Sequence, residues 1–274
     1  MESIHCIICN SSKSSDYLGF QDTLNNDNIF NLVKCKCGLI FLNPRPDSVE
    51  ISKYYNEAYL PHTNERKKMF DRVYAFIQKF TFKWKLKIIE RYSGKFNSVL
   101  DIGGGSGTFC KYLQNKNKLA TNYDPYYDKA DSKDFNDNVD SYDLITLWHS
   151  LEHMHDIDSI FSDINLKLKE NGLLYIAVPN YLAYERSYFG VSWAAYDIPR
   201  HLYHFKPETI AKLLNKYNFE IVNYHSMIQD TFFNIFLSKK TNILKKIYVL
   251  FVSILVIIFN KERSSSLLYI CKKK

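Results

Sequence analysis

A glycine-rich segment lies near the middle of the 274-residue chain, directly after a short apolar run. Glycines let the backbone turn sharply and approach a ligand closely, and a helix that follows offers free N–H groups to that ligand. A dinucleotide-binding loop needs Gly or Ala three residues after its second glycine, where this chain has Thr108. The residues that we expect to contact a ligand here are Asp101, Gly103, Gly104, Gly105 and Gly107.

A second carboxylate, Asp124, follows about twenty residues later, at the end of the next predicted strand. A carboxylate at this position can accept hydrogen bonds from both hydroxyl groups of a ribose. An NAD-binding site would also place an acid there, so Asp124 alone does not distinguish between cofactors. The order of strand, loop, helix and acid nevertheless favours a nucleoside-containing ligand over a glycine-rich turn without one.

Histidines gather after two other predicted strands. Glu152 and His153 follow the first, and His201 and His204 follow the second after a long connection. An imidazole with a pKa near 6.5 can remove a proton from a hydroxyl group, so His153, His201 or His204 could be a catalytic base. Alternatively, Glu152 and His153 only cap their loop and orient a ligand. A third interpretation is a divalent metal, held by His149, Glu152 and His153 with His201 or His204.

Four cysteines form two close pairs near the N-terminus: Cys6 and Cys9, then Cys35 and Cys37. In an intracellular enzyme such pairs bind metal more often than they form disulfides. Four thiolates around one ion make the tetrahedral zinc site of a ribbon, and a module of this size would take most of its stability from the metal. A metal-free remnant is the alternative, and His5 is a substitute ligand.

The elements that must position these residues alternate between strand and helix. Such alternation implies a mainly parallel sheet covered on both faces, with ligands at the carboxyl ends of its strands. Apolar patterns predict strands at 98–102, 119–123, 143–148, 172–178, 219–225 and 266–271, and helices at 64–92, 108–117, 156–168 and 207–217. We expect a zinc-ribbon-like module at 1–46, a helical lead-in at 47–94 and an α/β domain at 95–274.

Segments 99–107, 142–153 and 172–180 resemble the class I S-adenosylmethionine-dependent methyltransferases. Segments 199–205 and 207–214 resemble a branch common in surface-polysaccharide and natural-product gene clusters, which usually has Cys-x-x-Cys-Gly at its second cysteine pair. The resemblance implies a Rossmann-like, seven-stranded α/β sheet with a small N-terminal zinc-ribbon-like module. It also implies S-adenosylmethionine as methyl donor, and zinc as a structural ion.

The same resemblance assigns cofactor contacts to single residues. The loop glycines and Asp101 would line the methionine end, and Asp124 and Pro125 the ribose end. Asp134 and Phe135 would flank the adenine. Trp148 and His149 would lie beside the sulfonium. We expect the acceptor to be a sugar, a polysaccharide precursor or a related small molecule. A quinone or other lipid O-methyltransferase is the second interpretation, and a non-catalytic protein with the donor-binding fold is the third.

Positive charge is concentrated at the C-terminal end. The net charge is +7, and the nine Lys and Arg from Lys239 onward, against Glu262 alone, carry +8, so residues 1–238 carry about −1. No aromatic stacking surface accompanies this charge, which argues against a nucleic-acid partner. Residues 247–259 between these cations are apolar on all sides, and thirteen helical residues span only about 20 Å of a bilayer core of about 30 Å.

This apolar, basic segment, 239–263, therefore predicts either a helix lying on an anionic membrane surface or a helix buried in the core or in a dimer. We expect it to be an insertion between the last two strands. The N-terminal residues do not resemble a signal peptide. The expected location is the cytoplasm, with attachment to the inner face of the membrane through this segment. The sequence gives no indication of the oligomeric state.

Overall fold

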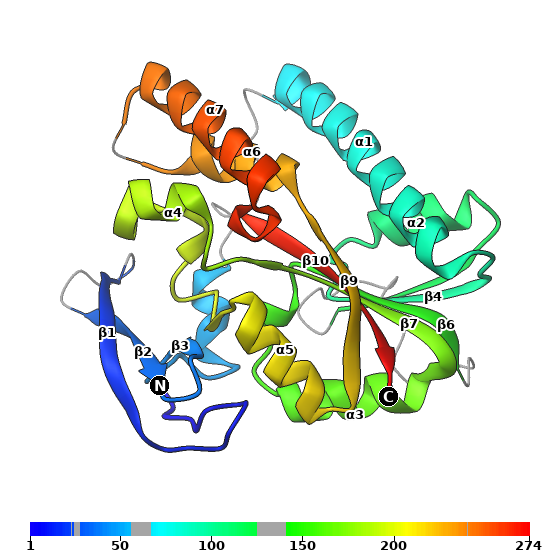
Figure 1. The fold of residues 1–274 in the computed structure, drawn as a ribbon, viewed down its shortest axis with the longest axis horizontal. Helices are drawn as coiled ribbons and strands as arrows, with labels where there is room; N and C mark the ends of the chain where they lie inside the picture. Colours follow the sequence, from blue (N-terminus) through cyan, green and yellow to red (C-terminus); the bar gives the residue numbers. More distant parts are fainter. Residues whose placement is uncertain (23, 25–27, 56–66, 125–140, 240) are drawn as a thin grey trace.

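The computed structural model describes residues 1–22, 24, 28–55, 67–124, 141–239 and 241–274, with the backbone alone at 67–77 and 79. Its larger sheet has six described strands in the order β5-β4-β6-β7-β10-β9. β4 to β7 are parallel, and β10 runs antiparallel to both of its neighbours (Figure 1). The strands are β4 (Ser98–Ile102), β5 (Leu119–Tyr123), β6 (Tyr142–Trp148), β7 (Leu168–Pro179), β9 (Phe219–Ser226) and β10 (Ser266–Lys273).

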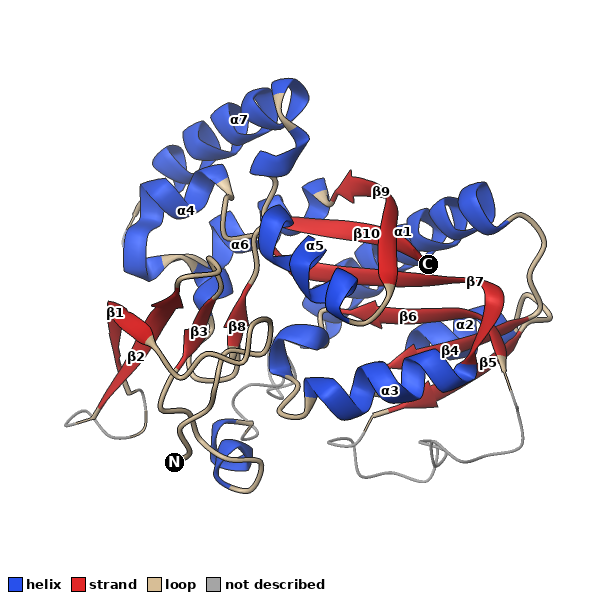
Figure 2. Ribbon diagram, turned by 60° about the horizontal axis from the view of Figure 1, so that its bottom comes forward, coloured by secondary structure: helices blue, strands red, loops and turns tan. Residues whose placement is uncertain are grey.

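Helices cover both faces of this sheet (Figure 2). Apolar residues of α3 and α5 pack on one face in a cluster that includes Leu100 and Leu147. Residues of α1 and α2 pack on the other face around Val99 and Leu144. The helices are α1 (Lys67–Ser93), α2 (Thr108–Gln114), α3 (Ile157–Lys167), α4 (Tyr184–Phe189), α5 (Pro207–Lys216), α6 (Ile228–Leu237) and α7 (Ile243–Phe259).

The α/β architecture is as predicted, and strands occupy all six predicted places. The seventh strand implied by the resemblance is not among the described residues. The predicted boundary at Gly172 is wrong, because α3 ends at Lys167 and β7 already begins at Leu168. Gly172 lies inside the strand, where a Cβ atom would come within 2.9 Å of the Asp143 carbonyl oxygen. This glycine therefore allows close backbone packing and does not end a helix.

A second sheet joins the N-terminal segment to the rest of the chain. Its order is β1-β2-β3-β8, and β8 (Tyr203–His204) comes from the connection after β7. The buried guanidinium of Arg45 donates to the Tyr203 hydroxyl and to the His155 carbonyl. Residues of both sheets share one apolar cluster. The three N-terminal strands are β1 (Ser14–Gln21), β2 (Ile29–Cys35) and β3 (Ile40–Leu42).

The apolar segment near the C-terminus is a helix, as predicted, but it begins earlier, at Ile243, because the Asn242 side chain accepts a hydrogen bond from the Lys245 amide. This helix, α7, follows β9 and α6 and precedes β10, so it lies between the last two strands of the chain. It packs beside α6 and α4 (Figure 1). Among the described helices, none has both the length and the apolar content to cross a bilayer.

Candidate functional site

The glycine loop connects β4 to α2 through three left-handed backbone positions. Gly103, Gly105 and Gly107 all have positive φ angles. The backbone amide of Gly105 donates a hydrogen bond to Asp124 Oδ2 at 2.7 Å, and the side-chain amide of Asn122 donates one to the Gly105 carbonyl oxygen at 2.9 Å. The loop and the end of β5 are therefore held together. This places Gly105 and Asp124, both predicted to bind the methyl donor, next to each other.

Two of the glycines are required by the packing of the protein itself. A Cβ atom on Gly103 would lie 2.3 Å from Cβ of Ser150, and one on Gly104 would lie 2.1 Å from Asn122 Oδ1. At Gly105, by contrast, a Cβ atom would meet nothing within 4 Å. The loop thus packs tightly against β5 and the turn after β6, and at Gly105 it leaves open space beside the Asp124 carboxylate, where a ligand has room.

The predicted ligand Asp101 is buried beneath the loop. It accepts a hydrogen bond from the Thr146 hydroxyl at 2.6 Å. Burial raises the pKa of Asp101 to about 6, although Lys85 nearby favours the charged carboxylate. Burial lowers the pKa of Lys85 to about 8, and its ammonium lies 4.1 Å from the ring centroid of Trp148. Lys85 could not be predicted from the sequence, because a lysine on an amphipathic helix gives no sign of facing inward.

Two cavities border this loop, and a third adjoins both of them. One of about 280 Å³ is lined by Asp101, Gly104 and Trp148, and one of about 520 Å³ by Gly103, Asp124 and His149. The largest, of about 1020 Å³, is lined by His149, Glu152, His153 and His201, and by β1 of the N-terminal sheet. We name the last one the acceptor cavity. His149 and His153 border both it and the cavity beside Asp124, so these two histidines stand between two binding spaces.

These residues fit the methyl donor implied by the sequence. Asp101 offers a carboxylate to an ammonium group, and Asp124 offers one to ribose hydroxyls. The buried Asn122 Oδ1 has no hydrogen-bond partner among the described residues, which leaves an acceptor beside the loop. Trp148 and His149 lie at the carboxyl end of β6, as predicted. The predicted contacts Pro125, Asp134 and Phe135 lie outside the described residues.

His149 has an unusual backbone and charge state. Its φ angle is 56°, which is uncommon for a residue other than glycine. Its Nε2 lies 2.8 Å from an Asp230 oxygen, and its Nδ1 lies 3.5 Å from Glu152 Oε1. Burial opposes the charged form, but these two carboxylates raise the pKa of His149 to about 10. The imidazolium is therefore charged at neutral pH, and the three groups together carry a net charge of −1.

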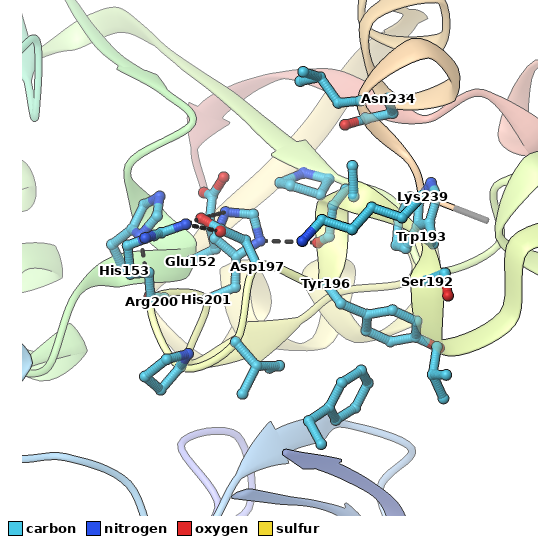
Figure 3. A pocket seen from close by; sticks show the side chains of 18 of the residues that line it. Glu152, His153, Ser192, Trp193, Tyr196, Asp197, Arg200, His201, Asn234 and Lys239 are labelled. Carbon is cyan, nitrogen blue, oxygen red and sulfur yellow. Dashed lines mark hydrogen bonds and ion pairs between the residues drawn. The ribbon is translucent and has the colours of Figure 1, made fainter. Parts of the chain in front are cut away.

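Two of the three histidines predicted as catalytic come together with Glu152 (Figure 3). One ligand atom from each of Glu152, His153 and His201 lies within 4.8 Å of the other two. We name these residues the Glu152 group. Glu152 is fully buried, and neither carboxylate oxygen has a hydrogen-bond partner among the described residues, although His149 forms an ion pair with it. Burial, together with His201, lowers the pKa of His153 to about 4.

Backbone carbonyls orient both rings of the Glu152 group. His201 Nδ1 lies 2.9 Å from the Ala195 carbonyl oxygen, and His153 Nδ1 lies 3.0 Å from that of Arg200. These nitrogens therefore carry the proton, and each Nε2 keeps a lone pair. His204 is separate: it lies buried in β8, where its ring packs against Tyr181 and Tyr196.

Charged residues that the sequence analysis did not single out complete the acceptor cavity. Asp197 lies 3.8 Å from His201 Nε2 and forms an ion pair with Arg200. Lys239 also points into this cavity (Figure 3). Asp230 enters it from α6, an element that we did not predict. Asp197 and Arg200 could have been predicted from the sequence, because they lie within four residues of the predicted His201. Nothing in the sequence around Asp230 indicated that it lines the cavity.

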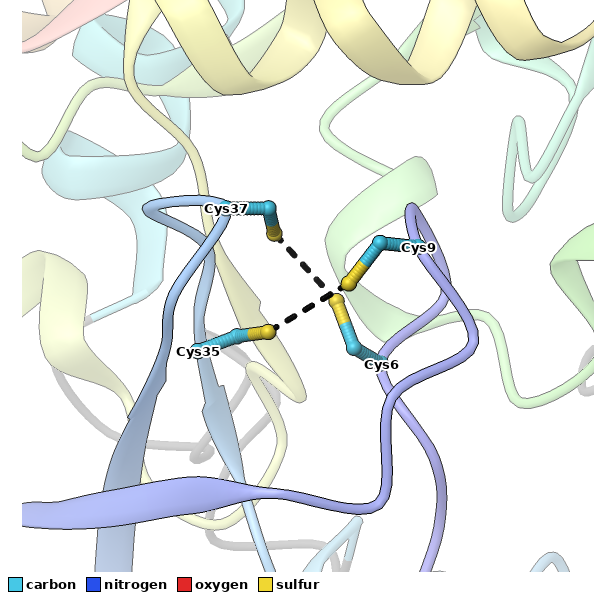
Figure 4. A group of neighbouring side chains, drawn as sticks. All are labelled: Cys6, Cys9, Cys35 and Cys37. Carbon is cyan, nitrogen blue, oxygen red and sulfur yellow. Dashed lines mark hydrogen bonds between the residues drawn. The ribbon is translucent and has the colours of Figure 1, made fainter.

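The four predicted metal-binding cysteines meet at one point (Figure 4). Sγ of Cys6 lies 3.5 Å from that of Cys37, and Sγ of Cys9 lies 3.5 Å from that of Cys35. All four sulfur atoms are within 4.8 Å of one another. Tetrahedral Zn–S bonds of about 2.3 Å place sulfur atoms roughly 3.8 Å apart, so the group fits zinc. A turn at Gly38, with φ of 101°, lets Cys35 and Cys37 face the same point.

Part of the chain matches a known protein family, and several solved structures are similar to it. Residues 66–224 match a family model described as a methyltransferase domain. Similar solved structures include a SAM dependent methyltransferase from Archaeoglobus fulgidus, with 19% identity, a TM-score of 0.45, and 73% of this chain and 100% of that chain covered. Another is 1,6-didemethyltoxoflavin-N1-methyltransferase from Burkholderia thailandensis, with 13% identity, a TM-score of 0.49, and 95% and 99% coverage. No curated protein gives a significant match. Since the family model spans more than half of the chain, this protein belongs to the methyltransferase domain family.

Proposed function

We propose that this protein transfers a methyl group from S-adenosylmethionine to a hydroxyl group of a sugar or polysaccharide precursor. The observation that carries the proposal is the shared wall between two cavities. His149 borders both the cavity beside Asp124 and the acceptor cavity. A donor held against Asp101 and Asp124 would thus present its reactive end to a molecule in the acceptor cavity.

The charges around His149 suit a cationic donor. S-adenosylmethionine supplies a methyl group bonded to a positively charged sulfur. Glu152 and Asp230 lie on either side of the His149 imidazolium, and the three groups together place a net charge of −1 at the junction of the cavities. Because these groups are buried or half-buried, water screens their field only weakly. They would stabilise a nearby cation and hold it in place without further rearrangement.

The acceptor cavity suits a polar molecule larger than a single small metabolite. Its volume of about 1020 Å³ is at the upper end of the usual range for small-molecule sites. Carboxylate, guanidinium and amide groups line it beside aromatic rings, among them Asp197, Arg200, Asn234 and Tyr196. Such a mixture offers several hydrogen bonds to hydroxyl groups together with apolar faces for a sugar ring. A quinone would leave many of these polar groups without partners.

His201 is the best-placed base for the acceptor hydroxyl. The Ala195 carbonyl holds Nδ1, so Nε2 is free to take the proton that the hydroxyl loses as its oxygen bonds to the methyl carbon. Asp197, 3.8 Å from Nε2, would stabilise the resulting imidazolium. His153 is a weaker candidate, because a pKa of about 4 makes it a poor base at neutral pH. His153 and Glu152 would instead orient the acceptor.

We also infer that Cys6, Cys9, Cys35 and Cys37 hold a structural zinc ion. Their sulfur atoms have the spacing that tetrahedral zinc requires. The cluster lies beside α5: the Lys212 ammonium donates to the Cys37 carbonyl, and that of Lys216 donates to the Ile7 carbonyl. The ion would stabilise the N-terminal sheet, whose β1 lines the acceptor cavity, and would take no part in the methyl transfer.

Calorimetric titration with S-adenosylmethionine tests the donor site. We expect binding to weaken below about pH 6, because burial raises the pKa of Asp101 to that value and the neutral acid no longer attracts an ammonium group. Each further pH unit should raise the Kd about tenfold. Asp101→Asn should bind weakly at every pH and lose this dependence. Absence of donor binding would indicate a non-catalytic protein that has kept the fold.

Transfer of a radiolabelled methyl group tests the acceptor. Nucleotide-activated sugars and short glycans should become labelled, and quinols should not. The assay should be run with wild-type protein and with Arg200→Gln, which removes a charge from the acceptor cavity and leaves the glycine loop intact. For this variant we expect a higher KM for the sugar and an unchanged Kd for the donor. Labelling of a quinol alone would overturn the sugar assignment and leave the donor assignment in place.

A further inference from the structure

The outer face of α7 is apolar along its whole length. Phe259 is 89% exposed and Leu244 is 74% exposed, and both are large apolar side chains that water does not favour. The neighbouring α6 also has exposed apolar residues, among them Phe232. We name the outer surface of α7 the α7 face; it consists of Ile243, Leu244, Ile247, Tyr248, Phe251, Leu255, Ile258 and Phe259.

The opposite side of the helix is already packed against the fold. Val249, Ser253 and Ile257 are buried at four-residue spacing, and α7 contacts α6 and α4 there. The helix is therefore a fixed part of the domain, and its outer residues are not needed by the core of this chain. A contiguous exposed apolar surface of this kind marks a site of interaction.

The charge at both ends of the α7 face indicates what covers it. From Lys239 to Arg263 the sequence has six Lys and Arg and one acid, Glu262. Lys245 lies exposed in the first turns of α7, and Lys261 lies exposed just after its end. Between Lys246 and Lys261 the chain carries no charge. Cations that flank an uncharged apolar helix match an anionic lipid surface, because each cation close to that surface adds electrostatic attraction.

We propose that the α7 face docks on an anionic membrane, with the helix lying in the plane of the interface. Seventeen helical residues extend only about 26 Å, less than a bilayer core of about 30 Å, so the helix would lie on the membrane and not cross it. α6 separates the α7 face from the acceptor cavity, which Phe233 and Asn234 of that helix line. Docking would bring this cavity close to the lipid headgroups. The docking proposal itself does not depend on the proposed methyl transfer.

Co-sedimentation with lipid vesicles tests the proposal. The full chain should pellet with vesicles of phosphatidylcholine and phosphatidylglycerol, and remain in the supernatant with phosphatidylcholine alone. Added salt should weaken the binding, because it screens the attraction between cations and lipid. Leu244→Gln should weaken it about tenfold, since one large apolar side chain would no longer enter the interface. Lys245→Gln with Lys261→Gln should weaken binding to the anionic vesicles alone.

Leu166→Gln is the matched control. Leu166 is also a leucine on a helix and is also 74% exposed, but it lies on α3, away from the α7 face. This variant should bind vesicles as wild type does. An unchanged melting temperature of Leu244→Gln would show that the variant is folded. The proposal fails if anionic lipid makes no difference, or if Leu244→Gln and Leu166→Gln bind equally. It also fails if sedimentation equilibrium shows a dimer that Leu244→Gln dissociates, because the face would then bind a second copy of the chain.

Discussion

The two clusters of potential metal ligands in this protein have similar spacing and different surroundings. The four cysteines and the Glu152 group both bring their ligand atoms within 4.8 Å. The thiols face one another at a point where two turns meet, and they form contacts as short as 3.5 Å. The Glu152 group faces a cavity of about 1020 Å³, and carbonyls already hold its two imidazole rings. Spacing alone therefore does not separate a structural ion site from a site for chemistry.

The two clusters also differ in the chemistry of their potential metal ligands. Four thiolates around one point suit a tetrahedral structural zinc ion. Two imidazoles and one carboxylate could bind several metals, but in this protein the carboxylate already has an imidazolium, His149, beside it. A divalent metal ion would have to compete with that imidazolium for the carboxylate. We therefore propose a structural role for the cysteines, and a role in acceptor binding and proton transfer for the Glu152 group.

The largest expected effect is a loss of methyl transfer when the Glu152 group is changed. His201→Ala should lower kcat by about 10²- to 10⁴-fold, the usual contribution of a general base. Donor affinity and melting temperature should change little, because the donor-site groups Asp101 and Asp124 remain in place. The measurement is methyl transfer at saturating donor, with His225→Ala as control. His225 lies on β9 and bonds to Tyr92, outside the acceptor cavity. Full activity of His201→Ala would remove the base from our mechanism.

The second expected effect is on metal content and stability. Cys9→Ser should reduce bound zinc from about one per chain to nearly none, and lower the Tm by roughly 5 °C or more, since the metal contributes to folding. Mass spectrometry under native conditions and thermal unfolding provide the two measurements. Cys110→Ser, which changes a buried cysteine of α2 outside the cluster, should keep its zinc. Zinc-free wild-type protein with an unchanged Tm would contradict the structural role.

How much of each cluster the sequence could predict depends on the distance along the chain between its parts. Cys6 and Cys9 are near neighbours, and so are Cys35 and Cys37, so two short patterns were enough to predict the group of four cysteines that the fold brings together. The core strands were predictable because buried parallel strands are short apolar runs. His153 and His201 are 48 residues apart, and only the fold shows that their rings lie 4.6 Å apart. β8 has two residues, too few for any pattern, and yet it joins the two sheets.

Residues that reach the site from elements far away in the sequence were the hardest to predict. Asp230 reaches His149 only because α6 follows β9 and turns back over the carboxyl end of the sheet. Lys85 faces Trp148 from a helix whose apolar pattern merely indicated amphipathicity. His204 was singled out because it lies close to His201 in the sequence, and in the fold their ring centroids are 6.4 Å apart. His204 is buried in β8, where its ring also packs against Tyr181 and Tyr196, so its catalytic role stays a prediction.

The smallest expected effect is the most direct test of the comparison between the clusters. If the Glu152 group binds no metal, a mild chelator that leaves the cysteine-bound zinc in place should change the rate of methyl transfer less than about twofold. Added Mg²⁺ or Mn²⁺ should likewise have little effect, because the His149 imidazolium already neutralises the Glu152 carboxylate. Glu152→Gln removes that carboxylate and keeps its shape, so it should retain about one zinc per chain while losing activity. A large rise in the rate of methyl transfer with added Mg²⁺, absent in Glu152→Gln, would instead indicate that both clusters bind metal. The inference from the charges around Glu152 would then be wrong.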